Sequence, residues 1–244
     1  MEEKLVKYNC LIFDFDGVVN DSGKPGCERI IEIVRNDGRH IPDDIWERFT
    51  GVWGSNGSQI KEGAWGHQGV EMMMLAFDLD RETADRLYKE WERIDATSFF
   101  PLVDSAAEIL EVLRSSGFNI CILTSRNREN LLSVLDHYNI ARFFDHIQAR
   151  DDWSFRKPNP HAFCLLLDRL KKNSDTALQE CVYIGDTPED FKAARDREIE
   201  NVSVLSGIFT REQFLAIGQK MANIIPSIKY LPEWLTDFSE TTYK

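Results

Sequence analysis

The chain has 244 residues, of which 43% are hydrophobic, and a formal net charge of −12 at pH 7. This length is sufficient for one large domain or for a core with a smaller second domain. The acidic balance opposes binding to nucleic-acid backbones and anionic membrane surfaces, so we expect small-molecule partners, no nucleic acid and no membrane. No segment reaches the roughly 18 apolar residues of a membrane span, and Met1–Lys4 lacks the pattern of a signal peptide, which predicts a cytoplasmic protein.

Five cysteines are scattered along the chain without a C-x-x-C pair, and they are Cys10, Cys27, Cys121, Cys164 and Cys181. Cys10, Cys121 and Cys181 lie in or beside apolar, strand-like runs, which is typical of small core residues. An odd number of cysteines fits a reducing compartment. We therefore expect neither a zinc site nor a set of disulfides.

The first apolar run, residues 10–13, ends in Asp14-Phe15-Asp16-Gly17. A buried strand followed by turn residues places Asp14 and Asp16 at the carboxyl end of a sheet, where open α/β folds form their ligand crevice. Side chains at i and i+2 of a strand point to the same face, so the two carboxylates would repel each other. The pair therefore predicts a cation or a positively charged neighbour at this position.

Residues 22–100 contain no convincing strand and carry helical periodicity instead. Apolar stripes or capping patterns predict helices near residues 30–34, 42–46, 72–76 and 80–97. A glycine-rich loop is expected at 51–58, between two of these helices. This segment is therefore interpreted as a helical insert after the first strand.

From Pro101 onward, helix and strand patterns alternate. Asp104 is the expected N-cap of the helix that follows it. Strands are predicted at 118–123, 146–149, 181–184 and 202–205, with helices at 105–116, 129–138, 161–172 and 188–195. This alternation predicts an α/β fold with a Rossmann-like, doubly wound parallel sheet covered on both faces. The expected domains are an α/β core, residues 1–20 and 101–244, and an inserted α-helical cap, residues 21–100.

Two further strand ends carry polar residues suited to phosphate binding. The predicted strand at 118–123 is followed by Thr124-Ser125-Arg126, whose hydroxyls and backbone amides can donate to anionic oxygens. A Thr-Ser pair can equally cap the next helix. Lys157 stands before Pro158, which restricts the local chain, so the ammonium could neutralise crowded acids or hold phosphate instead of being a solvated charge.

The strand at 181–184 ends in Gly185-Asp186-Thr187-Pro188-Glu189-Asp190. Asp186 and Asp190 are expected to face the same crevice as the acids after the first strand. Each could also serve only as a helix cap or as a charge that favours a helix N-terminus. The capping interpretation leaves unexplained why acids recur at two strand ends.

Taken in order, Asp14-x-Asp16, Thr124, Lys157 and Gly185-Asp186-x-x-x-Asp190 resemble the four motifs of the haloacid dehalogenase-like (HAD) phosphatase superfamily. The resemblance extends from about residue 13 to 207. The insert resembles the helical C1-type cap of relatives such as phosphoglycolate phosphatase and β-phosphoglucomutase. The resemblance to the superfamily is weakest across this cap.

The resemblance implies a Mg²⁺ cofactor and an aspartyl-phosphate mechanism. Asp14 would attack phosphorus, and Asp16 would protonate the leaving alkoxide and then take a proton from the hydrolytic water. Asp14, Asp186 and the backbone carbonyl of Asp16 would bind the metal, while Asp190 would act directly, through water or by holding the lysine. An acid at position 16 indicates phosphoryl transfer, because HAD dehalogenases and phosphonoacetaldehyde hydrolases lack it.

Thr124, the Ser125 amide and Lys157 would stabilise the oxygens of the transferred phosphoryl group. The expected function is hydrolysis of a small phosphorylated metabolite, such as a sugar phosphate or a phosphoglycolate-like acid. The alternatives are a phosphomutase of the β-phosphoglucomutase type and a phosphoryl-ligand binding or regulatory protein without turnover.

Substrate contacts are expected from the cap and from one residue of the second motif. Trp53 and Trp65, which lie among glycines, and Arg126, two residues after Thr124, are the candidates for substrate binding. Four further cations could bind a substrate carboxylate or be surface charges, and they are Arg29, Arg39, Arg48 and Lys61. No apolar heptad pattern indicates an oligomer.

Overall fold

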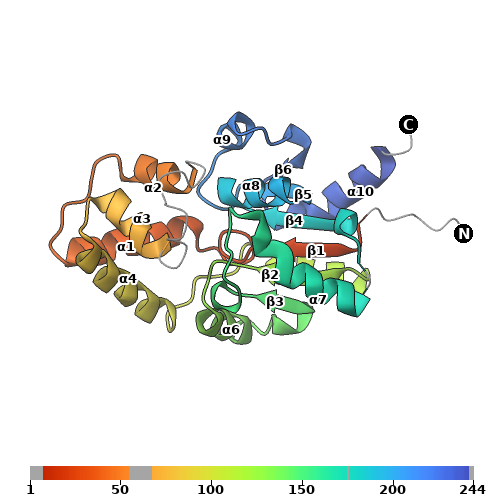
Figure 1. The fold of residues 1–244 in the computed structure, drawn as a ribbon, viewed down its shortest axis with the longest axis horizontal. Helices are drawn as coiled ribbons and strands as arrows, with labels where there is room; N and C mark the ends of the chain where they lie inside the picture. Colours follow the sequence, from red (N-terminus) through yellow and green to blue (C-terminus); the bar gives the residue numbers. More distant parts are fainter. Residues whose placement is uncertain (1–7, 55–67, 175, 242–244) are drawn as a thin grey trace, which may run out of the picture.

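The computed structural model describes residues 8–54, 68–174 and 176–241 (Figure 1). A six-stranded parallel sheet has the order β3-β2-β1-β4-β5-β6. The strands are β1 (Cys10–Phe13), β2 (Asn119–Leu123), β3 (His146–Gln148), β4 (Cys181–Gly185), β5 (Glu200–Val204) and β6 (Ile224–Ile225). Strands β2 and β3 follow β1 on one side of it in the sheet, and β4, β5 and β6 follow on the opposite side of β1. This confirms the predicted doubly wound α/β fold.

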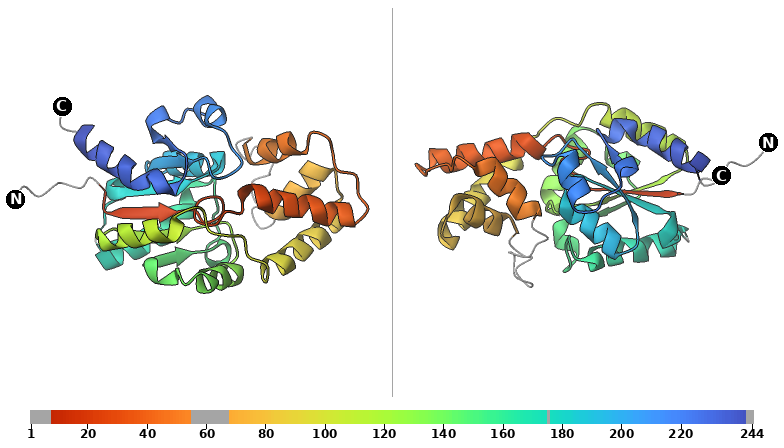
Figure 2. Two further views of the ribbon diagram at one scale, coloured as in Figure 1. Left: turned by 180° about the vertical axis from the view of Figure 1, so that it is seen from behind. Right: turned by 90° about the horizontal axis from the view of Figure 1, so that it is seen from above.

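Helices cover both faces of the sheet because the strand residues are apolar on both sides. Leu11 and Phe13 of β1 pack against helices on one face of the sheet, whereas Cys10 and Ile12 pack against helices on the other. The two layers are separated by the sheet in the right-hand view of Figure 2. The covering helices are α5 (Ala106–Ser115), α6 (Arg128–His137), α7 (Cys164–Ser174), α8 (Pro188–Asp196) and α10 (Leu231–Thr241), with α9 (Arg211–Ala216) beside β6. Cys10, Cys121 and Cys181 lie in this core as predicted.

Four helices lie between β1 and the rest of the sheet along the chain, at the carboxyl ends of the strands (Figure 1). They are α1 (Gly23–Asn36), α2 (Ile45–Gly54), α3 (Gln68–Phe77) and α4 (Arg81–Asp95). Their apolar residues form a cluster of their own, with Phe49, Met73 and Ala76 fully buried in it. Asp80 caps α4 by accepting the Thr83 N–H at 2.9 Å. The insert therefore has its own small core over the carboxyl edge of the sheet.

The predicted loop at 51–58 is wrong over its first four residues, which are the last turn of α2. Val52 is buried in the apolar cluster of the insert, so packing outweighs the low helix propensity of the flanking glycines. Residues 55–58 lie outside the described part of the chain. Strand β6 was not predicted, because two residues carry no recognisable period.

The N-cap of α5 is Ser105 and not the predicted Asp104. The Asp104 carboxylate instead accepts from Lys229 Nζ at 2.8 Å. The predicted helix at 161–172 begins as a 3₁₀ turn, Pro160–Phe163, before continuing as α7. Asn159 caps that turn through the His161 N–H, 2.9 Å from its Oδ1. The first difference goes with a side-chain bond to a distant residue, and the second with a local cap.

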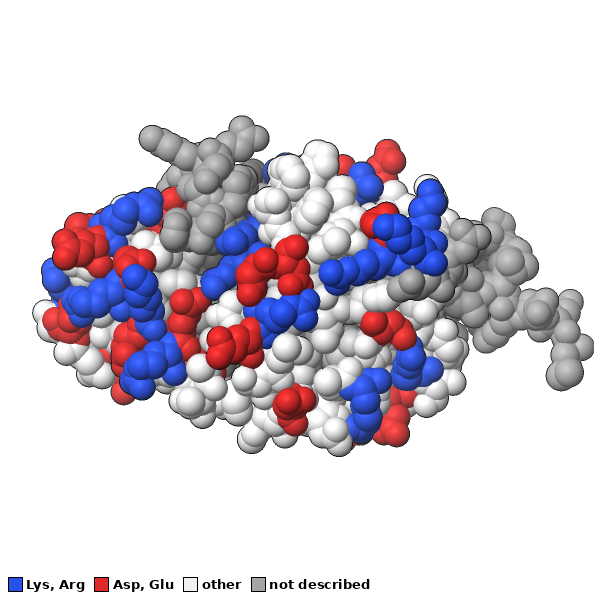
Figure 3. All heavy atoms as spheres, turned by 60° about the horizontal axis from the view of Figure 1, so that its bottom comes forward, with Lys and Arg blue, Asp and Glu red and all other residues white. Residues whose placement is uncertain are grey.

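Basic and acidic side chains are interspersed on the face drawn in Figure 3. Exposed ion pairs one helical turn apart also occur in the described chain, such as Lys89 with Asp85 and Lys172 with Asp168, each at 2.6 Å. Within the described residues, none of the helices is both long and apolar enough to cross a membrane.

Candidate functional site

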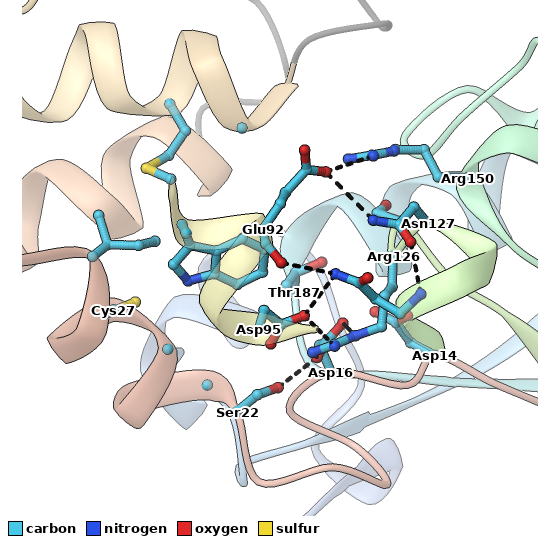
Figure 4. A pocket seen from close by; sticks show the side chains of 18 of the residues that line it. Asp14, Asp16, Ser22, Cys27, Glu92, Asp95, Arg126, Asn127, Arg150 and Thr187 are labelled. Atoms are coloured by element: carbon cyan, nitrogen blue, oxygen red, sulfur yellow. Dashed lines mark hydrogen bonds and ion pairs between the residues drawn. The ribbon is translucent and has the colours of Figure 1, made fainter. Parts of the chain in front are cut away.

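A cavity of about 230 Å³ lies between the carboxyl edge of the sheet and the helices of the insert (Figure 4). Strands β1 and β4 are neighbours in the middle of the sheet, where the chain reverses its direction of winding. Asp14 follows β1 and Asp186 follows β4, and both line the cavity. The predicted convergence of the two strand ends is therefore present at the crevice typical of this topology.

Lys157 is buried beneath the cavity and contacts two carboxylates. Its ammonium lies 2.8 Å from Asp14 Oδ2 and 2.7 Å from Asp190 Oδ1, and it donates to the Tyr183 hydroxyl at 3.0 Å. Burial lowers the pKa of Lys157, but the charges of the two aspartates outweigh it and raise the pKa above its usual value. The lysine is thus a fixed cation at neutral pH, as its position before Pro158 predicted.

Asp190 is fully buried, and both of its carboxylate oxygens are occupied. Oδ1 accepts from Lys157 and Tyr183, while Oδ2 accepts from the Thr187 hydroxyl at 2.7 Å and from the amides of Thr187 and Asp186. Burial raises the pKa of Asp190, but Lys157 and these donors outweigh it, so the net pKa lies below the usual value. Of the three roles predicted for Asp190, the geometry matches that of holding the lysine.

Asp186 has the opposite environment. It is buried, and its Oδ1 has no hydrogen-bond partner among the described residues. Gly17 and Gly207 leave room for it, because a Cβ on either would lie about 2 Å from Asp186 Oδ2. Burial and the nearby charge of Asp190 raise the pKa of Asp186 well above its usual value. A buried carboxylate oxygen without a donor is a position for a cation.

The acids fit a divalent metal ion. One carboxylate oxygen each of Asp14, Asp186 and Asp190 lies within 4.8 Å of the others. Lys157 forms ion pairs with Asp14 and Asp190 but not with Asp186, so the three carboxylates outnumber the one ammonium beside them. Oxygen-only ligands suit hard cations such as Mg²⁺. The unsatisfied Asp186 oxygen and the excess of negative charge would both be relieved by such an ion.

Asp14 itself is almost fully buried at the base of the cavity. Its Oδ1 accepts the Phe15 N–H at 2.7 Å, and its Oδ2 faces Lys157. Burial is the main cause that raises the pKa of Asp14 to about 7, partly offset by Lys157. One face of the carboxylate is therefore held by the protein.

Asp16 is held by Arg126. The guanidinium donates to Asp16 through Nη2 at 2.6 Å and Nε at 3.1 Å, and Ser22 donates to Asp16 Oδ1 at 2.6 Å. The remaining Nη1 of Arg126 reaches Asp95, at the end of α4, at 2.5 Å. Burial raises the pKa of Asp16, but the charge and bonds of Arg126 lower it below its usual value overall. Arg126, predicted as a substrate contact, thus connects the first motif to the insert.

Thr124 and Ser125 follow β2 at the same edge of the sheet. Ser125 lines the cavity, whereas Thr124 is buried outside its lining and accepts the Arg126 N–H at 3.1 Å. Asn127 caps α6 by accepting the Asn130 N–H. Trp65, Lys61 and the side chain of Trp53 lie outside the described residues. The next helix is therefore capped by Asn127 and not by the Thr-Ser pair, as the alternative interpretation had it.

The sequence did not reveal three contributors. Tyr183 lies inside β4, and only the alternation of the strand aims it at Lys157. Arg150 bridges the core to the insert by donating to Glu92 Oε1 at 2.8 Å (Figure 4). It also donates to the Tyr88 hydroxyl at 2.9 Å. Glu189 lines the cavity, and burial raises its pKa to about 8. The sequence feature that could have pointed to Glu189 is its position in the first helical turn after Gly185-Asp186.

Comparison with known proteins places these residues in a family context. A family model described as haloacid dehalogenase-like hydrolase matches residues 8–196. The phosphorylated carbohydrates phosphatase of Thermotoga maritima is 23% identical over 195 residues, covering 79% of this chain and 82% of that protein. The phosphoglycolate phosphatase of Yersinia pseudotuberculosis serotype I is 27% identical over 195 residues, covering 78% and 79%. The crystal structure of a hydrolase from Pseudomonas syringae shares the fold, with a TM-score of 0.68, 24% identity and coverage of 94% and 98%.

Proposed function

The chain belongs to the haloacid dehalogenase-like hydrolase family, and we propose that it is a Mg²⁺-dependent phosphatase acting on a small phosphomonoester through an aspartyl-phosphate on Asp14. The observation that carries the proposal is the buried Asp14 carboxylate, held 2.8 Å from Lys157 beside the unsatisfied oxygen of Asp186. We also propose the division into an α/β core, residues 1–20 and 101–244, and a cap, residues 21–100. The separate apolar cluster of the insert supports this division. A cytoplasmic location stays a prediction.

In its ionised form, which the charge of Lys157 favours, the Asp14 carboxylate is already a nucleophile and needs no general base to attack phosphorus. In the proposed first step an Asp14 oxygen bonds to phosphorus, and the bond to the ester oxygen breaks. Lys157 and the Ser125 amide offset charge on the transferred oxygens, and the buried Thr124 supports this turn through its bond to Arg126. The carboxylate is then released when water attacks the same phosphorus.

Asp14, Asp186 and the backbone carbonyl of Asp16 would hold the metal, and Asp190 would fix Lys157. When bound, Mg²⁺ supplies positive charge that offsets repulsion between the carboxylates and the phosphate. The occupied oxygens of Asp190 support its assignment to the lysine.

Metal binding is expected to stabilise the folded protein measurably. Saturating Mg²⁺ should raise the midpoint of thermal unfolding by about 5–10 °C relative to EDTA, because the ion binds the folded state and relieves repulsion among the buried acids. Asp186→Asn should lose most of this increase, whereas Asp43→Asn, an exposed control, should keep it. An equal response of the two variants to Mg²⁺ would place the ion elsewhere.

Asp16 is proposed as the residue that moves protons. In the structure its pairing with Arg126 favours the ionised form, which is the form that accepts a proton from water in the second half-reaction. Protonation of the leaving oxygen in the first half-reaction requires the acid form. We therefore propose that Arg126 positions Asp16, and that the hydrogen bonds between them weaken when Asp16 protonates the leaving oxygen of the substrate.

Asp16→Asn tests this role. We expect the variant to lose about 10²–10⁴-fold in kcat with an alkyl phosphate, whose alkoxide needs a proton. The loss should be smaller with 4-nitrophenyl phosphate, because its leaving group departs without protonation. Steady-state phosphate release on both substrates measures the difference. If the variant hydrolyses the alkyl ester at the parent rate, Asp16 is not the proton donor.

The alternative functions are distinguished by products. A panel of phosphorylated metabolites with and without Mg²⁺ tests the proposal directly: release of inorganic phosphate indicates a hydrolase, and an isomerised sugar phosphate indicates a mutase. The mutase alternative is not favoured, since both curated relatives named above are phosphatases. A phosphoryl-binding protein without turnover would release no phosphate from any ester.

A further inference from the structure

The cavity has a charged end and an apolar end. The charged end holds Asp14, Asp186 and Lys157. Five apolar side chains of the described residues also line the cavity, beside polar residues such as Asn127 and Asn130. They come from the insert and from the segment after β5, and they are Cys27, Ile30, Met72, Trp91 and Ile208. At about 230 Å³ the cavity lies below the usual range of ligand pockets, so it suits a small substrate. A phosphate placed at Asp14 would leave its organic group beside this apolar wall.

The charges of the cavity disfavour a second anionic group. Its described lining has twice as many acids as bases; the acids are Asp14, Asp16, Glu92, Asp95, Asp186 and Glu189, and the bases are Arg126, Arg150 and Lys157. Each base is already paired with acids: Arg126 with Asp16 and Asp95, and Arg150 with Glu92. Lys157 is likewise between two aspartates. Apart from the metal ion proposed at Asp14 and Asp186, each cation of the described lining is therefore already neutralised, and a substrate carboxylate would have to displace an acid to pair with one.

Trp91 lines the cavity and carries a hydrogen-bond donor that the described residues leave unused. Its indole N–H is buried and has no hydrogen-bond partner among the described residues. The ring is fixed by stacking on Tyr88, with centroids 5.7 Å apart and planes within 9°. Tyr88 is in turn held by Arg150 at 2.9 Å. A buried donor on a fixed ring is suited to one acceptor oxygen of a ligand.

From these three features we infer that the substrate is the phosphomonoester of an uncharged, mainly apolar alcohol that carries one hydrogen-bond acceptor for Trp91. The inference deepens the proposed phosphatase function and rests on it. It disfavours a phosphoglycolate-like acid, one of the substrates expected from the sequence, because such an acid carries a carboxylate. Specificity would then come from the exclusion of substrates with a second negative charge as much as from contacts with the apolar wall and Trp91.

Matched ligands separate the substrate class from the reaction. On the Mg²⁺-loaded full chain, kcat/KM for phenyl phosphate should exceed that for 4-carboxyphenyl phosphate by at least about tenfold. The non-hydrolysable pair benzylphosphonate and 4-carboxybenzylphosphonate should show the same ratio of Kd by calorimetry. Equal or reversed preference in binding would overturn the inferred class and leave the phosphatase proposal intact. Preferential binding of benzylphosphonate without hydrolysis of any ester would support the inferred ligand class and overturn the phosphatase proposal.

Two variants test the residues behind the preference. Trp91→Phe keeps the ring and removes the N–H, so it should weaken binding of 4-methoxybenzylphosphonate about 2–10-fold more than binding of benzylphosphonate. Glu92→Gln removes the negative charge that pairs with Arg150. The ratio of Kd for 4-carboxybenzylphosphonate to Kd for benzylphosphonate should therefore fall at least threefold. Trp46→Phe, on an exposed tryptophan of α2, is the matched control and should change neither ratio. If both variants fold and neither changes its Kd ratio, the assignment of the preference to Trp91 and Arg150 is overturned. If a variant fails to fold, the ligand pairs measured on the parent protein still test the inferred substrate class.

Discussion

Asp14→Asn is expected to abolish phosphate release from every ester, with a loss of at least about 10⁴-fold in kcat. An amide oxygen is a poor nucleophile toward phosphorus and a weaker ligand for Mg²⁺, so both proposed roles of the side chain fail together. The measurement is steady-state phosphate release with saturating Mg²⁺. Trapping of a phosphorylated protein by acid quench should succeed with the parent and fail with the variant.

The same substitution should leave the fold intact. Asp14, Asp186 and Asp190 lie close together, and of the three Lys157 contacts only Asp14 and Asp190, so one carboxylate fewer lowers their mutual repulsion. In EDTA the thermal midpoint of Asp14→Asn should therefore equal or exceed that of the parent. Asp43→Asn, on an exposed acid of the insert, provides the matched control and should keep full activity. Mg²⁺-dependent turnover by a folded Asp14→Asn protein would exclude Asp14 as the nucleophile.

The sheet was largely predictable because its strands are short apolar runs separated by helical patterns. Residues 10–13 of β1 are buried on both sides, and such strands lack the alternation that would confuse them with surface strands. Prediction failed where a contact with a distant residue decides which residue begins a helix, as at Ser105, or where an element is too short to carry a period, as in β6. In both cases the deciding interaction is made with a distant part of the chain, such as Lys229 for Asp104.

The core of the candidate site was predictable for a topological reason. Parallel strands bring their carboxyl ends to one edge, so the acids after β1 and β4 had to converge. The pairing of Arg126 with Asp95 was not predictable, because it depends on where the end of α4 lies over the sheet. The same holds for Arg150 and Glu92. Contacts between the insert and the core follow from tertiary packing and leave no periodic signal in the sequence.

Lys157→Met is expected to produce the largest loss of stability, about 3–5 kcal/mol in the free energy of unfolding at neutral pH without metal. The ammonium is buried and lies within 2.8 Å of two carboxylates, so its removal leaves buried acids without their counter-charge. Urea denaturation of parent and variant measures the loss. Lys89→Met is the matched control: that lysine is 70% exposed in its pair with Asp85, and we expect a change below about 0.5 kcal/mol.

The pH dependence of this loss identifies its cause. Without Lys157, the buried acids have folded-state pKa values above their unfolded values, so the folded state binds more protons and gains stability as the pH falls. Burial already raises the pKa of Asp14 to about 7 with the lysine present. The deficit of Lys157→Met should therefore shrink between about pH 8 and pH 5, and Mg²⁺ should recover part of it at high pH. A deficit that is independent of both pH and Mg²⁺ would mean that Lys157 stabilises the fold through packing of its aliphatic chain and not through its charge.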